Sequence, residues 1–200
     1  MSEMVVFNEQ GLNAMRHGKI LPYALEQLFE MLGIPVMSYW EYRYAVEEPA
    51  AAAVKDVPFT TIYGCKGTTD FVLYDHARGL RIRFWCKWQE TSGTVDEKLP
   101  YLCGNIKQFP ENEVVFVVGG AGWRDGAMGW FTKNAKRGAR RADGRKQKVL
   151  VLTIDKVVEY LLALYGREDE IQDVIPKLKS LMRENHQMLD GQLSLEECLD

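Results

Sequence analysis

The five consecutive apolar residues Val114 to Val118 (VVFVV) constrain the fold more than any other feature of this sequence. A β-branched run without polar alternation is typical of a strand in a sheet that is covered on both faces. A helix near Ala127 to Arg141 and a strand at Val149 to Ile154 follow it. Together they predict a β-α-β unit, and therefore an α/β fold with a central mixed sheet flanked by helices.

The residues before this unit predict one amphipathic helix and three strands. Apolar residues recur at helical spacing from Pro22 to Leu32, and Gly33 follows as a C-cap. Residues 47–58 combine turn residues with a run of alanines, which indicates a loop or a short helix. Segments rich in β-branched and aromatic residues predict strands at 60–63, 70–74 and 80–89, with a turn at 64–67.

Alternation along the strand at 80–89 separates its two faces. Arg83, Trp85, Lys87 and Gln89 lie on one face, and the other face carries Ile82, Phe84, Cys86 and Trp88. The first face is unusually polar for a central strand. A loop at 91–98 is then expected to lead into a helix near 99–106.

The C-terminal part of the chain predicts helices only. Residues 155–165 form one helix that stops at Gly166, residues 171–189 form a second, and Ser194 to Glu197 resemble a capping box for a last turn. From Arg167 onward the chain has nine acids against four bases. We therefore expect one globular domain over residues 1–166 and an acidic helical extension over 167–200.

Composition indicates a soluble, cytoplasmic protein. The apolar and charged fractions, 46% and 26%, are ordinary, and the longest apolar runs are too short to span a bilayer. The four cysteines show no CxxC spacing and are expected to be reduced thiols, and the three histidines are too far apart in sequence to predict a zinc site. Gly119 to Gly122 lacks the GK[ST] ending of a phosphate loop, so no nucleotide cofactor is expected.

Positive charge is concentrated in one segment of an otherwise acidic chain. Residues 133–148 contain eight Lys or Arg against one acid, although the whole chain has a formal net charge of -3. Several of these cations share one side of the predicted helix, which suits a DNA backbone, although a solvated helix face is the alternative. The candidate nucleic-acid-binding residues are Lys133, Lys136, Arg137, Arg140, Arg141 and Arg145.

Three residues form a candidate catalytic set. Hydrolysis of a phosphodiester bond requires a divalent metal held by oxygen ligands and a cation near the attacking water. Asp70 begins one predicted strand, Lys87 lies on the next, and Glu26 lies on the first helix. Taken singly, each residue has an alternative interpretation: Asp70 as a turn cap, Lys87 as a solvated or stacked lysine, and Glu26 as a surface carboxylate. Their combination favours a nuclease.

The order of these residues resembles the core of the PD-(D/E)XK nuclease superfamily. Asp70 matches the motif aspartate, Thr69 takes the place of the proline, and Lys87 matches the motif lysine. The stretch from Cys86 through Tyr101 is similar to a bacterial and phage-associated branch. The resemblance implies a restriction-endonuclease-like core and a DNA endonuclease dependent on Mg2+ or Mn2+. It also implies Asp70, the Cys86 carbonyl and Glu26 as metal ligands. Gln89, on the same strand face as Lys87, is a second-tier candidate, and a homodimer would let two such sites cut both DNA strands.

The chain departs from the family motif at Trp85, where an Asp or Glu is required two residues before Lys87. Three explanations stay open at this point. The acid has migrated to Glu90, Glu26 or Asp75; the chain is a disabled nuclease that keeps its binding surface; or the alignment with the motif is shifted. A metal-dependent DNA endonuclease is thus the first hypothesis, and a nuclease-fold protein that binds DNA or a protein without cutting is the second. A third is an interaction module in which the acidic C-terminal helix docks on a partner.

Overall fold

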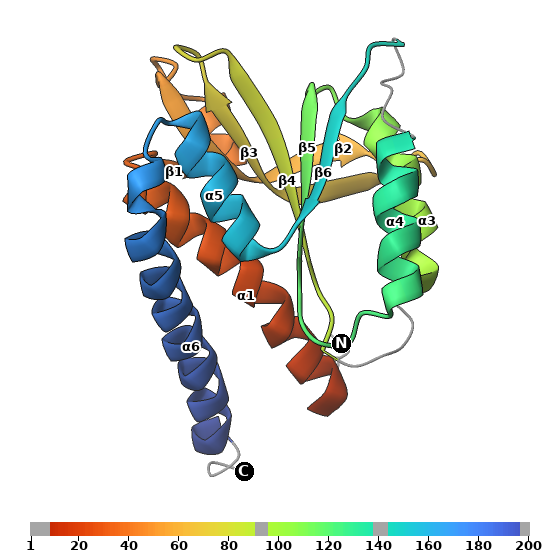
Figure 1. The fold of residues 1–200 in the computed structure, drawn as a ribbon, viewed down its shortest axis with the longest axis vertical. Helices are drawn as coiled ribbons and strands as arrows, with labels where there is room; N and C mark the ends of the chain where they lie inside the picture. The colour runs from red at the N-terminus through yellow and green to blue at the C-terminus, as the bar shows by residue number, and fades with distance from the viewer. Residues whose placement is uncertain (1–8, 91–95, 138–143, 197–200) are drawn as a thin grey trace, which may run out of the picture.

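The computed structural model describes residues 9–90, 96–137 and 144–196. At its centre lies a six-stranded sheet with the strand order β1-β2-β3-β4-β5-β6 (Figure 1). The strands are β1 (Val36–Ser38), β2 (Ala51–Thr60), β3 (Lys66–Asp75), β4 (Leu80–Trp88), β5 (Glu113–Gly119) and β6 (Lys148–Leu152). The helices are α1 (Glu9–Met31), α2 (Tyr39–Arg43), α3 (Leu99–Asn105), α4 (Asp125–Arg137), α5 (Ile154–Leu164) and α6 (Ile171–Glu196). Short 3-10 turns lie at η1 (Asp96–Lys98), η2 (Ile106–Gln108) and η3 (Glu168–Glu170).

The sheet is mixed, as predicted. Strands β2, β3 and β4 form an antiparallel meander, whereas β4, β5 and β6 run parallel and β1 runs parallel to β2. The predicted β-α-β unit corresponds to β5, α4 and β6. These observations confirm the restriction-endonuclease-like α/β architecture with a C-terminal helix.

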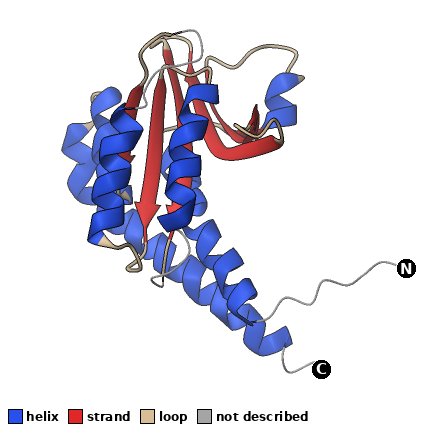
Figure 2. Ribbon diagram, turned by 90° about the vertical axis from the view of Figure 1, so that its right-hand side faces the viewer, coloured by secondary structure: helices blue, strands red, loops and turns tan. Residues whose placement is uncertain are grey.

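Helices cover both faces of the sheet (Figure 2). On one face, α1 and α5 bury Phe29 and Leu161 in a cluster with Phe84 of β4. On the other face, α3 and α4 bury Leu102 and Phe131. Residues 114–118 of β5 are all buried between these two layers, which confirms the prediction of a strand covered on both sides.

Helix α6 is part of the packed fold. Val174 and Leu178 of α6 belong to the same core cluster as α1 and α5, and Lys179 forms an ion pair with Asp155 of α5 at 2.6 Å. The helix runs without interruption to Glu196, so the prediction of a separate last turn beginning at Ser194 is wrong. None of the described helices is long and apolar enough to cross a membrane.

The largest error of sequence interpretation concerns β2. Residues 51–58 were expected to form a loop or a short helix, and they form most of a ten-residue strand, whereas residues 61–63 lie in the turn that follows it. Ala52, Ala53 and Val54 are completely buried between neighbouring strands, so burial overrides the low β propensity of alanine. Pro58 is tolerated because β1 pairs only with residues 53–55, which leaves that side of the strand open at Pro58.

The two predicted faces of β4 are confirmed, but the polar character of one face is not. Ile82, Phe84 and Cys86 point into the cluster under α1, and Trp85 points into the cluster under α3 and α4. Arg83 is 1% exposed and Trp85 is 7% exposed. At Arg83 and Trp85 this face is therefore an interior surface, and Lys87 follows at its partly buried end.

Candidate functional site

Asp70 lies where strands β3 and β4 separate. The last backbone pair between these strands is Phe71 with Phe84. Beyond this pair, a hydrogen bond to a side chain replaces the backbone pairing of the two strands. Asp70 Oδ2 accepts a hydrogen bond of 2.7 Å from the backbone N–H of Cys86. Asp70 therefore holds β3 and β4 together at the point where their backbone pairing ends. Because Oδ2 already accepts this hydrogen bond, only part of the carboxylate is available to a ligand.

Burial sets the electrostatics of Asp70. Loss of solvent around the carboxyl raises its pKa, while the Cys86 N–H and the Lys87 ammonium act in the opposite direction. The carboxylate of Asp56 adds to the increase. Asp70 thus lies among charged neighbours in a partly dry environment, which is a common property of functional carboxylates.

Lys87 lies beside Asp70 on the adjacent strand. Its ammonium is 4.9 Å from the centre of the Trp85 ring, which is a cation–π contact. Burial lowers the Lys87 pKa, Asp70 raises it, and Lys98 lowers it further. The predicted Asp70 and Lys87 are thus brought together, and Lys98 adds a second cation nearby.

The thiol and the backbone carbonyl of Cys86 have different surroundings. Its thiol is buried on the α1 side of the sheet, and burial raises the thiol pKa well above its usual range. In a strand the N–H and C=O of one residue point to the same side, so the Cys86 carbonyl is directed toward Asp70 as its N–H is. The carbonyl oxygen is the only group of Cys86 that suits a hard cation.

Glu26 lies in a pocket of about 400 Å³ between α1 and the sheet. Its carboxylate is bound by Lys55 of β2, whose Nζ is 3.0 Å from Oε1 and 2.9 Å from Oε2. The pocket is lined by Lys19, Pro22, Tyr23, Glu26, Lys55, Asp56, Asp70, Phe71 and Asn185. The structure therefore brings the predicted Glu26 and Asp70 into one pocket, together with two unpredicted lysines and an unpredicted aspartate.

The order of secondary structure and the position of these residues agree with a comparison against known families. A sequence model of the PD-(D/E)XK nuclease superfamily domain matches residues 13–163 of the chain. The chain belongs to this superfamily. Membership suggests a nuclease-type function. No curated protein and no solved structure matches the chain.

Trp85 is the main difference from the superfamily motif, and it is a core residue. Its ring contacts Phe59, Phe109 and Phe116 at centroid distances of 5.6, 5.7 and 5.8 Å. The indole thus fills an aromatic cluster and leaves no carboxylate two residues before Lys87.

Two of the three acids considered as replacements bind other side chains. Glu90 accepts a hydrogen bond of 2.8 Å from the Trp88 indole, and Asp75 lies at the far end of β3, where it binds Arg78 and Tyr165. The third, Glu26, shares a pocket with Asp70. Among the described residues, no group of three His, Cys, Asp or Glu side chains could hold a metal ion. The residues present therefore do not fit a complete site for the divalent metal that the superfamily generally uses.

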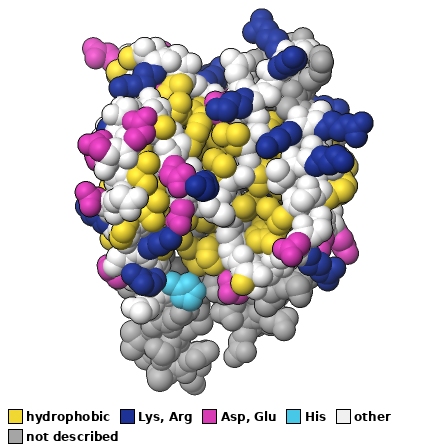
Figure 3. All heavy atoms as spheres, viewed as in Figure 1, with side chains coloured by type: hydrophobic (Ala, Val, Ile, Leu, Met, Phe, Trp, Pro, Cys, Tyr) yellow, Lys and Arg dark blue, Asp and Glu magenta, His cyan; other side chains and the backbone are white. Residues whose placement is uncertain are grey.

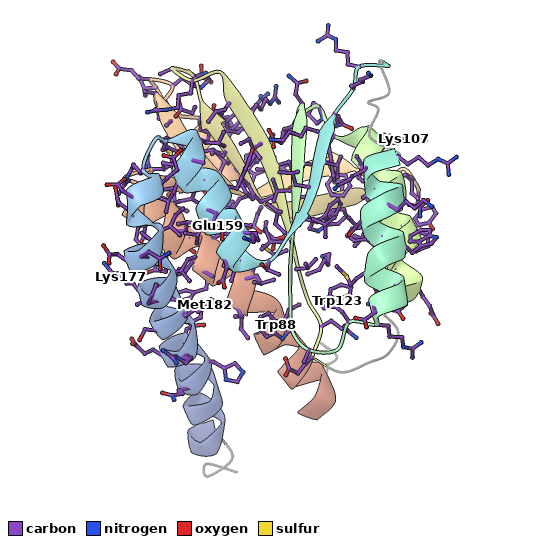
Figure 4. All side chains as sticks on the ribbon, in the orientation of Figure 1. Trp88, Lys107, Trp123, Glu159, Lys177 and Met182 are labelled. Carbon is purple, nitrogen blue, oxygen red and sulfur yellow. The ribbon has the colours of Figure 1, made fainter. Side chains whose placement is uncertain are left out.

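The backbone of Gln89 closes the loop after β5. The Gln89 N–H donates to Gly119, and its carbonyl accepts from the Gly122 N–H. Two tryptophans pack around the same loop: the Trp88 ring lies against Gly119, and the Trp123 indole donates to the Gly119 carbonyl at 2.8 Å (Figure 4). The loop is thus a packed element next to Lys87, and Gln89 contributes to it through its backbone.

The first part of the basic segment, residues 133–137, lies on α4, on the opposite face of the sheet from α1. Lys133, Lys136 and Arg137 are exposed on this helix, and Lys and Arg side chains gather over it in Figure 3. Arg145 is also exposed, whereas Arg140 and Arg141 lie outside the described residues. Sequence analysis missed Trp130, which is 44% exposed on α4. The three- and four-residue spacing of Trp130, Lys133 and Arg137 is visible in the sequence and places them on one face.

Proposed function

We propose that this chain is a DNA-binding protein built on the nuclease fold, in which metal-dependent cleavage is impaired. The observation that carries the proposal is the burial of Trp85 in an aromatic cluster, at the position where the superfamily motif requires an acid. An indole offers no oxygen to Mg2+ or Mn2+, and hard cations need oxygen ligands. Glu26, the other conventional ligand, is already bound by Lys55.

DNA binding is supported by the exposed face of α4. Gly126, Gly129, Trp130, Lys133, Lys136 and Arg137 lie within an arc of about 120° of the helix circumference. The cations suit phosphates, the tryptophan offers a surface on which a base can stack, and the glycines leave the helix backbone open to a close approach. A Cβ added at Gly126 or Gly129 would meet no atom within 4 Å.

The cations also connect α4 with the candidate site. Lys98 interacts electrostatically with Lys87, and Arg124, just before α4, forms an ion pair with Asp96 at 3.5 Å. Helix α4 then extends for about 20 Å toward Arg137. A DNA backbone that follows this side of the protein would meet Lys98 and Arg124 near the candidate site, beside the acids Asp96, Glu97 and Asp125, and then the cations Lys133, Lys136 and Arg137 of α4.

A second candidate function is a metal-dependent DNA endonuclease with Mg2+ or Mn2+ as cofactor. One observation favours it: Asp70 and Glu26 share a pocket, and Lys87 interacts with Asp70. The homodimer expected from the family resemblance stays a prediction, which sedimentation of the full chain would test.

One experiment separates the two candidates. Binding of a fluorescent DNA duplex is measured together with cleavage of supercoiled and branched DNA in Mg2+ or Mn2+, for the wild type, Asp70→Ala and Lys87→Ala. We expect salt-dependent binding by all three proteins and no cleavage above background. Wild-type cleavage that both substitutions abolish would establish the endonuclease instead, and absence of DNA binding at low salt would contradict both candidates.

A further inference from the structure

The pocket beside Asp70 already contains a cation of its own. Lys55 Nζ donates to both carboxylate oxygens of Glu26, so neither oxygen is free of the ammonium. The ion pair is only partly exposed, with side-chain exposures of 38% for Lys55 and 29% for Glu26. A divalent ion that binds Glu26 must therefore displace the ammonium or accept it as a close neighbour of like charge.

Lys55 lies in a pocket that contains three acids. Asp56 and Asp70 line the same pocket as Glu26. They occupy facing positions of β2 and β3, because the pairs on either side of them are Lys55 with Phe71 and Val57 with Thr69. Carboxylates gathered in this way repel one another and require a positive charge nearby.

The backbone of β2 places Lys55 at this point. Ala53 packs under α1, and alternation puts Lys55 on the same face, two residues further along. The next residue, Asp56, has φ of 53°, a left-handed conformation that is uncommon for a residue other than glycine. After it the alternation of β2 changes phase, since Val54 and Val57 belong to the same cluster on the opposite face. Lys55 is thus the last residue of this strand face before the irregularity.

We propose that the Lys55 ammonium is the resident cation of this pocket and takes the place of the divalent metal ion that the superfamily generally uses. The pocket then binds such a metal only when Lys55 is removed. This inference rests on the proposed function, because it supplies a second reason, independent of Trp85, for impaired metal-dependent cleavage. It concerns metal affinity, so the α4 face that would bind DNA does not enter its test.

Calorimetric titration of the full-length chain with Mn2+, without DNA, tests this proposal. Lys55→Met removes the ammonium and keeps most of the aliphatic stem. We expect its affinity for Mn2+ to exceed that of the wild type by at least about tenfold. Lys55→Arg keeps the charge, and Lys19→Met removes a charge from the same pocket without breaking the Glu26 ion pair. Both controls should behave as the wild type does, and adding Asp70→Asn to Lys55→Met should abolish the gain.

Two results would overturn the proposal. One is a wild-type protein that binds Mn2+ as tightly as Lys55→Met, and the other is a folded Lys55→Met protein that gains no affinity. If Lys55→Met does not fold, Glu26→Gln gives the same answer from the other partner. If Lys55 is the resident cation, Glu26→Gln should respond to Mn2+ as the wild type does. If the wild type binds Mn2+ and Glu26→Gln does not, a metal ion uses Glu26 and the proposal is wrong. Loss of DNA binding would affect the proposed function alone and would leave these titrations intact.

Discussion

Arg83 and Glu111 form a two-point ion pair in the interior of the protein. Arg83 Nε and Nη2 donate to the Glu111 carboxylate at 2.6 and 3.0 Å, and the two residues are 1% and 0% exposed. Arg83 Nη1 also donates to the hydroxyl of Thr69 at 2.7 Å. The pair thus connects β4 with the segment before β5 and with the residue next to Asp70.

Removing one partner of this pair should strongly destabilise the fold. Glu111→Ala leaves the Arg83 charge buried without a counter-ion, and we expect a loss of about 3–5 kcal/mol in the free energy of unfolding. Chemical denaturation measures this loss. The exposed pair between Lys156 and Glu159 is the control, since Glu159→Ala should cost about 1 kcal/mol or less. Similar losses of stability for Glu111→Ala and Glu159→Ala would contradict the conclusion that the Arg83–Glu111 pair is a buried ion pair that the fold requires.

Trp85 should behave as a core residue. Trp85→Ala removes a ring that touches three phenylalanines and Lys87, and we expect the free energy of unfolding to fall by about 3–5 kcal/mol. Trp130→Ala on the exposed face of α4 is the matched tryptophan control and should change stability by about 0.5 kcal/mol or less. A mild effect of Trp85→Ala would show that the indole is not part of the packed interior.

The pH dependence of stability should reveal the buried Asp70 carboxyl. Its pKa is raised in the folded protein, first by burial. In the unfolded chain the Asp70 pKa is about 4. Between this value and the raised pKa of Asp70 in the folded protein, the folded chain still holds a proton that the unfolded chain has released. Stability therefore falls as the pH rises through this window. Asp70→Asn removes the titration, and its amide oxygen can still accept the Cys86 N–H.

Stability of Asp70→Asn relative to the wild type should therefore increase as the pH is raised from the unfolded pKa toward neutrality. Denaturant titrations at several pH values measure this difference, and Asp173→Asn on the exposed part of α6 serves as the control. A difference that stays constant or reverses across the window would show that burial does not disfavour the charged form of Asp70.

Much of the fold was accessible from local sequence patterns. The uninterrupted VVFVV run identified β5 as a doubly covered strand, and alternation assigned the faces of β4 correctly. Gly33 and Gly166 were expected to end helices, and both adopt positive φ after α1 and α5. These features depend on a few neighbouring residues, so the sequence contains the information directly.

The candidate site was only partly accessible, because its missing members depend on tertiary contacts. Lys55 and Asp56 lie in a segment whose alanines and proline have low β propensity, and only burial between β1 and β3 makes it a strand. The ion pair between Glu26 and Lys55 joins residues 29 positions apart. No local sequence pattern predicts such a contact.

Gly120 should tolerate no side chain. Its φ is 89°, and a Cβ at this position would lie 2.1 Å from the carbonyl oxygen of Gln89. We expect Gly120→Ala to reduce the free energy of unfolding by more than about 1 kcal/mol. Gly129→Ala in α4 is the matched control: its Cβ meets no atom within 4 Å, and the substitution should stabilise the protein by up to about 1 kcal/mol. Equal effects of the two alanines would contradict the packing of the loop against Gln89.

DNA binding by the α4 face should depend on both its charge and its tryptophan. Lys133→Ala and Lys136→Ala each remove an exposed cation, and each should reduce the salt dependence of the affinity by about one unit in the slope of log K against log [salt]. Trp130→Ala removes a stacking surface, so it should weaken binding of single-stranded DNA by about 1–3 kcal/mol and leave the slope nearly unchanged. Fluorescence anisotropy at several salt concentrations separates the two effects.

Lys177→Ala, on α6 away from this face (Figure 4), is the charge control and should leave both quantities as in the wild type. Equal losses from Lys177→Ala and Lys133→Ala would mean that DNA responds to the overall charge of the protein and does not bind the α4 face.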